Sequence, residues 1–239
     1  MTAATAKSAY LQGIRDGWPF LFMAVPFALL FGVVAGEAGL ELIETAAFSL
    51  LVIAGASQFA ALQMMVEGAA IPLILLAALA VNLRMAMYSA SLVPHLGTAP
   101  LWQRALIAYL NFDQTYLVSI AKYEDAPSMS VRDKVRFFLG VATPIAPAWL
   151  AATVAGALLG QAIPPDYALD FIVPIMFLAM VAPMLRTIAH VAAALVSICV
   201  ALALVWLPSG VGLLIAAACA MLTGAGVESW LERRAEAPA

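Results

Sequence analysis

Charged and polar side chains interrupt two long apolar segments of this chain. Asn82 and Arg84 lie in one segment, and Asn111, Asp113 and Gln114 lie in the next. An ionised side chain at the centre of a membrane helix costs about 2.5–3.5 kcal/mol on insertion scales, so such residues face partners inside a bundle and mark a function. A buried guanidinium keeps its proton and needs an acceptor. We therefore predict an ion pair between Arg84 and Asp113 that can open to bind a substrate or a proton.

The helical period groups the polar residues of both segments on common faces. At 1.5 Å per residue, Arg84 and Asp113 would lie at depths of roughly 14 and 18 Å, near the bilayer midplane. The alternative to a binding site is that Arg84 and Asp113 form a structural ion pair that only holds two helices together. Residues three, four and seven apart share a face, which places Arg84 with Tyr88 and Ser91, and Asp113 with Tyr109 and Tyr116.

Small residues predict a break in a preceding apolar segment. Gly55, Ala56 and Ser57, followed by Gln58, stand in the stretch IAGASQF. Glycine and serine weaken a helix, and small residues permit close backbone approach. A half-broken helix here would leave backbone groups free for a zwitterionic ligand. The alternative is a packing face, with Ser57 and Gln58 bonded to a neighbouring helix.

Two prolines mark a fourth candidate group. Pro144 and Pro147 lie in the apolar stretch GVATPIAPAW, and each removes a backbone donor and kinks a helix. The carbonyls that lose their donors need another partner, which neighbouring residues, water or a ligand can supply. We include both prolines among the candidate substrate-binding residues, with helix shape alone as the alternative.

Composition assigns the chain to membrane proteins. Hydrophobic residues make up 65% of the 239 residues and charged residues only 10%, whereas soluble domains have about 25% charged residues. A span needs about 20 apolar residues, which predicts an all-α bundle of about eight transmembrane helices, with seven as the alternative. The predicted spans are 18–35, 43–66, 69–93, 101–121, 135–159, 168–185, 188–207 and 210–230.

The distribution of basic residues predicts the orientation. With the N-terminus in the cytoplasm, only Arg104 of the 11 lysines and arginines would lie outside, and Arg84 would lie within the membrane. This bias follows the positive-inside rule. We therefore expect one multi-pass domain in the plasma (inner) membrane, with residues 1–17 and 231–239 in the cytoplasm. Similar VAG elements in spans one and five suggest a parallel internal repeat with kinked or broken helices.

Motifs for other activities are missing from the sequence. It has no HExxH zinc motif, no GxSxG elbow and no GxxxxGK[ST] phosphate loop. We therefore expect no enzyme activity, no cofactor and no metal, and no nucleic-acid partner. A transporter energised by an ion gradient is the main prediction; an uncoupled channel for a small solute and a scaffold subunit are the alternatives.

Four motifs can be compared with known families: GASQF in span two, NLR in span three, the Asp-centred DQ in span four and the opening GIRDGWPFLFMAVPFALLFGVVAGEAGL. Together they resemble the AzlC family, the large subunit of bacterial branched-chain amino acid exporters. The resemblance runs from about residue 12 to the last span and is most specific over residues 13–123. Two positions depart from the family pattern, since Met85 follows NLR where relatives often have His, and Gln114 follows Asp113 where relatives often have Glu.

The resemblance implies an exporter of leucine, isoleucine, valine and related apolar amino acids such as methionine, with a small AzlD-type membrane subunit as partner. We expect a secondary transporter, with the proton as the candidate coupling ion. Arg84 would then meet the substrate carboxylate, and Asp113 would meet the ammonium group or carry the proton. The candidate substrate-binding residues are Gly55, Ala56, Ser57, Gln58, Asn82, Arg84, Tyr88, Asn111, Asp113, Gln114, Tyr116, Pro144 and Pro147.

Overall fold

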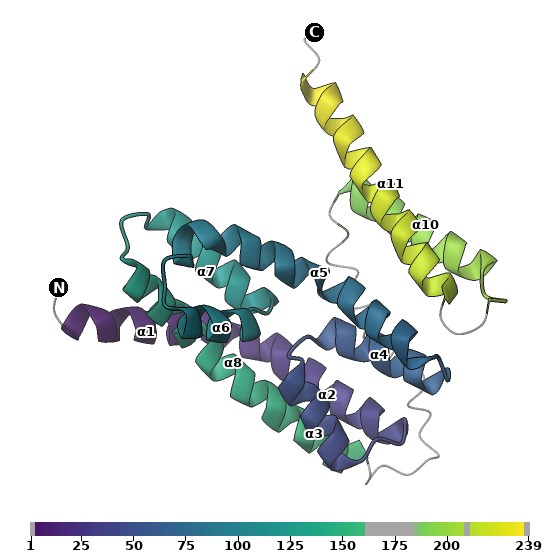
Figure 1. Cartoon of the computed structure of the whole chain (residues 1–239), viewed down its shortest axis with the longest axis horizontal. Coiled ribbons are helices and arrows are strands. Elements are labelled where there is room, and N and C mark those ends of the chain that lie inside the picture. Colours follow the sequence, from purple (N-terminus) through teal and green to yellow (C-terminus); the bar gives the residue numbers. More distant parts are fainter. Residues whose placement is uncertain (1–2, 161–184, 186, 208–210, 237–239) are drawn as a thin grey trace. The chain divides into compact units, whose positions relative to one another are not determined.

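The computed structural model describes residues 3–160, 185, 187–207 and 211–236 (Figure 1). All regular elements in these ranges are helices, which confirms the predicted all-α membrane protein. Within the described residues, four helices are long and apolar enough to cross a membrane: Ser8–Glu37, Ile71–Leu96, Val131–Gly160 and Val211–Leu231. The predicted span 168–185 lies outside the described residues except for Leu185.

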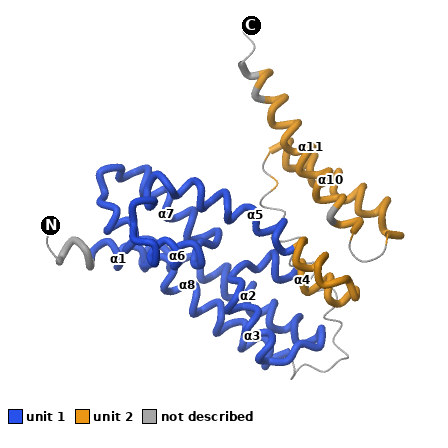
Figure 2. The backbone as a smooth tube through the Cα atoms, viewed as in Figure 1, with its two compact units in different colours: residues 1–59, 78–164 blue, residues 60–77, 165–239 orange. Residues whose placement is uncertain are grey.

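The chain forms two compact units, which we describe separately (Figure 2). The first contains residues 1–59 and 78–164, and the second contains residues 60–77 and 165–239. In the second unit, α10 (Ile188–Ala203) packs against α11 (Val211–Glu236). The Thr187 side chain caps α10 by accepting a hydrogen bond from the His190 backbone N–H at 3.2 Å. All candidate site residues lie in the first unit.

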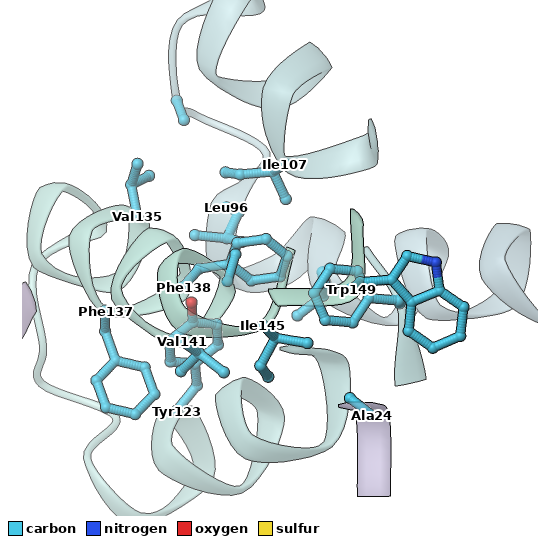
Figure 3. Close-up of a cluster of buried hydrophobic side chains, with 14 of the residues drawn as sticks. Ala24, Leu96, Ile107, Tyr123, Val135, Phe137, Phe138, Val141, Ile145 and Trp149 are labelled. Atoms are coloured by element: carbon cyan, nitrogen blue, oxygen red, sulfur yellow. The ribbon is translucent and has the colours of Figure 1, made fainter. Parts of the chain in front are cut away.

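A pair of long helices forms the centre of the first unit. Helix α1 (Ala3–Gly17), the 3-10 turn η1 (Trp18–Phe20) and α2 (Leu21–Glu37) follow one another and pack along α8 (Val131–Gly160). The N-terminal segment, which we expected to lie in the cytoplasm, is thus helical from Ala3 and packed. Figure 3 shows buried side chains of the core, to which α8 contributes Phe137, Phe138, Val141, Ile145 and Trp149.

Glycines set the close approach of these two helices. A Cβ on Gly13 would overlap the Phe137 carbonyl oxygen, and a Cβ on Gly140 would overlap the Tyr10 carbonyl oxygen. Small residues at helix contacts in membranes permit such an approach. A second pair of such contacts lies farther along the two helices. A Cβ on Gly32 of α2 would overlap the Thr153 carbonyl oxygen of α8, and a Cβ on Gly156 of α8 would overlap the Leu29 carbonyl oxygen of α2.

The order of these contacts shows that the two helices are parallel. Gly13 meets Gly140, and the later Gly32 meets the backbone beside Gly156. At each crossing, a glycine of the first helix contacts a carbonyl oxygen of the second, and a glycine of the second contacts a carbonyl oxygen of the first in the same way. The two helices are therefore related by an approximate two-fold rotation. This arrangement supports the predicted parallel repeat, which pairs span one with span five.

A break is present, but it lies at residues 52–54, just before the predicted residues 55–58, which are themselves helical. Helix α3 (Leu42–Leu51) ends before residues 52–54, and α4 (Gly55–Val66) begins after them. Phe48 before the break and Phe59 after it both pack on Phe31, with ring centroids 5.6 and 5.4 Å away. The chain therefore turns back at residues 52–54 and forms a helical hairpin.

A second broken hairpin follows α5 (Ile71–Leu96). It contains α6 (Leu101–Tyr109), a break at residues 110–112 and α7 (Asp113–Asp125). Successive residues of α7 meet successive residues of α5: Asp113 pairs with Arg84 at 2.9 Å, and the Tyr123 ring lies 5.4 Å from the His95 ring. Helices α5 and α7 are therefore parallel, and α6 must run back from the end of α5.

This hairpin corrects the prediction that residues 101–121 form one crossing. His95, near the end of α5, lies 3.3 Å from Lys134 Nζ, near the start of α8. The starts of α1 and α8 and the ends of α5 and α7 therefore share one end of the first unit. Tyr109 also departs from the predicted common face with Asp113, because the break separates them, and its hydroxyl donates to the Leu50 carbonyl.

The two halves of this arrangement form an inverted repeat. A long helix is followed by a broken hairpin in each half, and the half-helices match in length, with 10 and 12 residues in α3 and α4 and 9 and 13 in α6 and α7. Helix α2 runs parallel to α8, whereas α5 runs the other way. The hydrogen bond from Tyr109 to Leu50 joins the two hairpins beside their breaks.

Charge differs between the two ends of the first unit. We call the end with the starts of α1 and α8 the basic end; it carries Lys7, Arg104, Lys122, Arg132, Lys134 and Arg136. At the opposite end, Glu37 ends α2, Glu41 is the N-cap of α3 and Glu44 lies in its first turn. Residues 37–44 contain no lysine or arginine. Arg104, the one exception in the predicted topology, thus joins the other basic residues. The positive-inside rule predicts that the basic end is cytoplasmic.

Candidate functional site

The predicted approach of Arg84 and Asp113 is confirmed. Arg84 Nη1 lies 2.9 Å from Asp113 Oδ2, and the two side chains are 31% and 34% exposed. Arg84 stands at the middle of the 26-residue α5, and Asp113 is the first residue of α7. A carboxylate is favourable at this position, because the N-terminus of a helix carries a partial positive charge. A partly accessible ion pair thus lies at the tip of the second hairpin.

Polar and aromatic contacts fix this tip against α5. The rings of Tyr88 and Tyr116 stack with centroids 4.1 Å apart and an interplanar angle of 7°. The Tyr116 hydroxyl donates to Ser91 Oγ at 3.0 Å, and Asn111 Nδ2 donates to Ser89 Oγ at 3.1 Å. These contacts follow the face that we predicted for Arg84, Tyr88 and Ser91.

Several buried polar atoms at this tip have no hydrogen-bond partner of ordinary geometry. They are Asn82 Oδ1, Arg84 Nε, Asn111 Oδ1 and Asp113 Oδ1. An unsatisfied buried polar group costs about 1–3 kcal/mol, so native proteins rarely keep one without a reason. Gln114, the next residue of α7, is half-buried. The cluster therefore offers donors and acceptors to a polar ligand.

The segment from Gly55 to Gln58 has a different role. The Ser57 hydroxyl donates to the Ala54 carbonyl at 2.9 Å, and Gln58 Nε2 donates to Ser49 Oγ at 2.9 Å. Ser49 is in turn 3.0 Å from Thr153 Oγ1 of α8. This chain of bonds favours the packing alternative, because it holds the first hairpin together and against α8.

Packing also explains Gly55. A Cβ at this position would overlap the Phe27 ring and lie 2.8 Å from Trp149. Ala56 beside it is half-buried. Within the described ranges, no hydrogen bond or ion pair joins residues 55–58 to the Arg84–Asp113 pair. The two candidate groups are therefore separate, and a substrate contact of residues 55–58 stays a prediction.

The two prolines lie inside α8 without interrupting it. Helix α8 continues from Val131 to Gly160 through Pro144 and Pro147. Pro144 is half-buried and Pro147 is exposed. Their predicted part in substrate binding stays a prediction.

Sequence reasoning missed a buried cluster at the basic end. Lys134, interpreted only as a topology signal, is 6% exposed, and its Nζ lies 5.4 Å from the centre of the Tyr123 ring. The Tyr123 hydroxyl donates to the Lys134 carbonyl at 2.8 Å. Burial raises the pKa of Tyr123, which keeps its hydroxyl protonated. His95 lies in the last turn of α5. The sequence held no signal for this cluster, because its members come from three helices.

Comparisons with known proteins agree with this architecture of membrane helices. The AzlC protein family matches residues 19–163. The inner membrane protein YgaZ of Escherichia coli (strain K12) is 27% identical over 189 residues, which cover 74% of this chain and 73% of that protein. An uncharacterized membrane protein of Archaeoglobus fulgidus is 30% identical over 211 residues, which cover 85% of this chain and 88% of that protein. No solved structure matches the chain. Because the family match spans more than half of its length, the chain belongs to the AzlC family.

Proposed function

We propose that this chain is the substrate-carrying subunit of a secondary exporter for branched-chain and related apolar amino acids. The observation that carries this proposal is the Arg84–Asp113 ion pair at the tip of a broken hairpin. Transporters of small solutes place their sites near the bilayer midplane, at discontinuous helices and between repeats. The pair lies at the middle of α5 and at the start of α7 after a break, which supports a site of this kind.

A zwitterionic amino acid is complementary to an internal ion pair. Its carboxylate can replace the carboxylate of Asp113 on the guanidinium of Arg84, and its ammonium group can take the place of that guanidinium on Asp113. The exchange leaves the net charge of the site unchanged, so it avoids burying an uncompensated charge. Guanidinium also binds carboxylates with two parallel hydrogen bonds. The stacked rings of Tyr88 and Tyr116 supply apolar surface beside the pair.

Asp113 is the residue that we propose for proton coupling. A carboxylate that loses its arginine partner during transport has a higher affinity for a proton. Met85 and Gln114 stand where the family pattern often has titratable residues. In this chain, Asp113 would therefore carry the proton without help from either neighbour.

The working exporter in this proposal contains a second, small membrane protein of the AzlD type. The complex would lie in the inner membrane, with the basic end of the first unit in the cytoplasm. The name of the Escherichia coli relative, an inner membrane protein, supports this location.

The proposal is tested by efflux of leucine from cells that have been loaded with a leucine-containing dipeptide. Arg84→Ala and Asp113→Asn, each produced at the wild-type level with the partner subunit, should lower the efflux rate at least tenfold. The matched controls are Arg136→Ala and Asp133→Asn, which break the 3.7 Å ion pair within the first turns of α8. These controls should keep the wild-type rate.

The alternative functions predict other outcomes. If the ion pair only braced helices, Arg84→Ala and Asp113→Asn would lower protein level or thermal stability, and the rate per folded molecule would stay the same. If the protein were an uncoupled channel, the rate of leucine efflux would stay the same when the proton gradient is removed. Leucine efflux that is equal with and without the wild-type protein would contradict the proposal altogether.

A further inference from the structure

We infer that a cavity between α5 and α6 is the entry site for the amino acid, reached from the basic end before the substrate meets the Arg84–Asp113 pair. This inference rests on the proposed function and names the path by which the substrate reaches the Arg84–Asp113 pair. The cavity has a volume of about 170 Å³ and lies wholly within the first unit.

The residues of the cavity change in character along its length. Arg104, in the first turn of α6, stands toward the basic end. Apolar side chains, among them Leu92 and Ile107, line its wall. At the deep end lie the buried Asn111, in the break that precedes α7, and Ser89, which is itself exposed. The cavity thus combines a guanidinium, an apolar wall and a polar end, and its volume is several times the roughly 30 Å³ of one liquid water.

Asn111 supplies an independent reason to expect a ligand. It is 1% exposed, and it lines the cavity. Its Nδ2 is bonded to Ser89, whereas its Oδ1 is buried without a hydrogen-bond partner. An ammonium group at the deep end would donate to this oxygen. Asn111 also stands two positions before Asp113 in the sequence. Arg84 and Asp113 do not line the cavity, so the substrate would move on from Asn111 to reach the ion pair.

The spacing of Arg104 and Asn111 implies two successive positions. Arg104 lies in the first turn of α6 and Asn111 in the break after it, so five residues of helix, a rise of roughly 7.5 Å, and two further residues separate them. This is longer than the distance between the carboxylate and ammonium groups of one amino acid. Arg104 would therefore hold the carboxylate first, with the branched side chain against the apolar wall. Asn111 would then take the ammonium group as the substrate moves inward to Arg84.

Kinetics can assign the role of Arg104. In inside-out membrane vesicles, whose cytoplasmic face is outward, we expect Arg104→Ala to raise the KM for leucine uptake about five- to tenfold and to leave kcat within twofold. Arg104→Lys should restore part of the KM, because an ammonium group also binds a carboxylate. Arg136→Ala, at the same end but outside the cavity, should keep the wild-type KM. Equal KM values for Arg104→Ala and the wild type would overturn this role.

Labelling tests occupancy directly. A cysteine is introduced at Ala108, which lines the cavity, or at the exposed Ala105 on the same helix, in a Cys199→Ser/Cys219→Ser background. In the same vesicles, leucine should slow maleimide labelling of Ala108→Cys at least threefold. Labelling of Ala105→Cys should not change, and neither should labelling of either variant in the presence of glutamate.

The other possible outcomes of these experiments also support or overturn the inferred entry site. Unchanged labelling of Ala108→Cys in a protein that still transports leucine would overturn the entry site and leave the proposed function standing. Labelling that responds to the phosphatidylglycerol content of the vesicles, and not to leucine, would assign the cavity to a lipid headgroup and overturn the inference. If the wild type transports no leucine, the proposed function is wrong. Labelling of Ala108→Cys then still tests whether leucine occupies the cavity: protection by leucine supports occupancy, and unchanged labelling overturns it.

Discussion

Asp113 illustrates how a single residue depends on the break in its helix. As the first residue of α7, it benefits from the positive end of the helix dipole, and it pairs with Arg84 at 2.9 Å. The same carboxylate in the middle of a continuous helix would lack the dipole contribution. The break at residues 110–112 thus helps to stabilise a carboxylate at the tip of the second hairpin.

The contacts of Tyr116 predict graded effects of substitution. Tyr116→Phe keeps the stack on Tyr88 and loses the hydrogen bond to Ser91, which is worth about 0.6 kcal/mol between membrane helices. Tyr116→Ala also loses the aromatic pair, worth about 0.5–1.5 kcal/mol beyond its burial. Thermal unfolding in detergent should therefore rank wild type above Tyr116→Phe and Tyr116→Phe above Tyr116→Ala.

A double-mutant cycle provides the control for this prediction. Adding Ser91→Ala to Tyr116→Phe should cause little further loss, because both changes remove the same hydrogen bond. Fully additive losses would show that the two side chains do not interact in the folded protein.

At the scale of helices, glycine contacts determine how α1 and α2 pack on α8. Gly32 and Gly156 each face a carbonyl oxygen of the other helix at a distance that leaves no room for a methyl group, whereas a Cβ on Gly36 would lie 3.7 Å from the Ala157 carbonyl oxygen. This difference provides a matched pair of substitutions on one helix.

Gly32→Ala should destabilise the protein, because the backbones must separate to admit the methyl group. Overpacking of this kind costs about 1–3 kcal/mol. Gly36→Ala should be neutral or stabilising, since alanine is the better helix former by about 1 kcal/mol. Thermal unfolding of the purified variants measures both effects, and equal midpoints for the two variants would contradict the close parallel packing.

The second hairpin makes a prediction about sidedness. The described contacts place the loops on either side of α6–α7 at the same end of the first unit, whereas one continuous crossing would place them on opposite sides of the membrane. Single cysteines at the exposed residues Thr98 and Ser128 should therefore react from the same side. A cysteine at Ala38, in the segment that joins α2 to α3, should react from the other side.

The measurement is labelling by a membrane-impermeant maleimide in right-side-out and inside-out vesicles. The positive-inside rule predicts that Thr98→Cys and Ser128→Cys react only in inside-out vesicles. Labelling of these two cysteines from opposite sides would show that α6 and α7 form one crossing.

The sequence was sufficient to predict the contact between Arg84 and Asp113 and insufficient to predict the path of the chain. The cost of burying Arg84 and the need for an acceptor pointed to Asp113, and small residues pointed to the break before Gly55. The break before Asp113 was missed, because Leu110, Asn111 and Phe112 contain no glycine or proline. The bonds of Gln58 agree with the packing alternative, but the sequence could not name the partners: Gln58 donates to Ser49 of α3, and Ser49 in turn contacts Thr153 of α8.

At the scale of the first unit, two kinds of repeat are combined. Helices α2 and α8 are parallel and related by reciprocal glycine contacts, whereas α2 with its hairpin and α5 with its hairpin run in opposite directions. Inverted repeats in transporters allow alternating access, in which one half rocks against the other around a fixed site. The breaks of both hairpins are joined by the bond from Tyr109 to Leu50, which places the Arg84–Asp113 pair near the boundary between the halves.

The central claim is that the Arg84–Asp113 pair binds substrate, and exchanging the two charges tests it most directly. The double variant Arg84→Asp/Asp113→Arg keeps an ion pair between α5 and α7 but moves the guanidinium to the start of α7, where the substrate carboxylate would have to bind in the reverse orientation. In vesicles reconstituted with equal amounts of folded protein and the partner subunit, we predict that leucine transport by this variant falls at least tenfold below wild type. Transport at the wild-type rate would contradict the claim and show that the pair only holds two helices together.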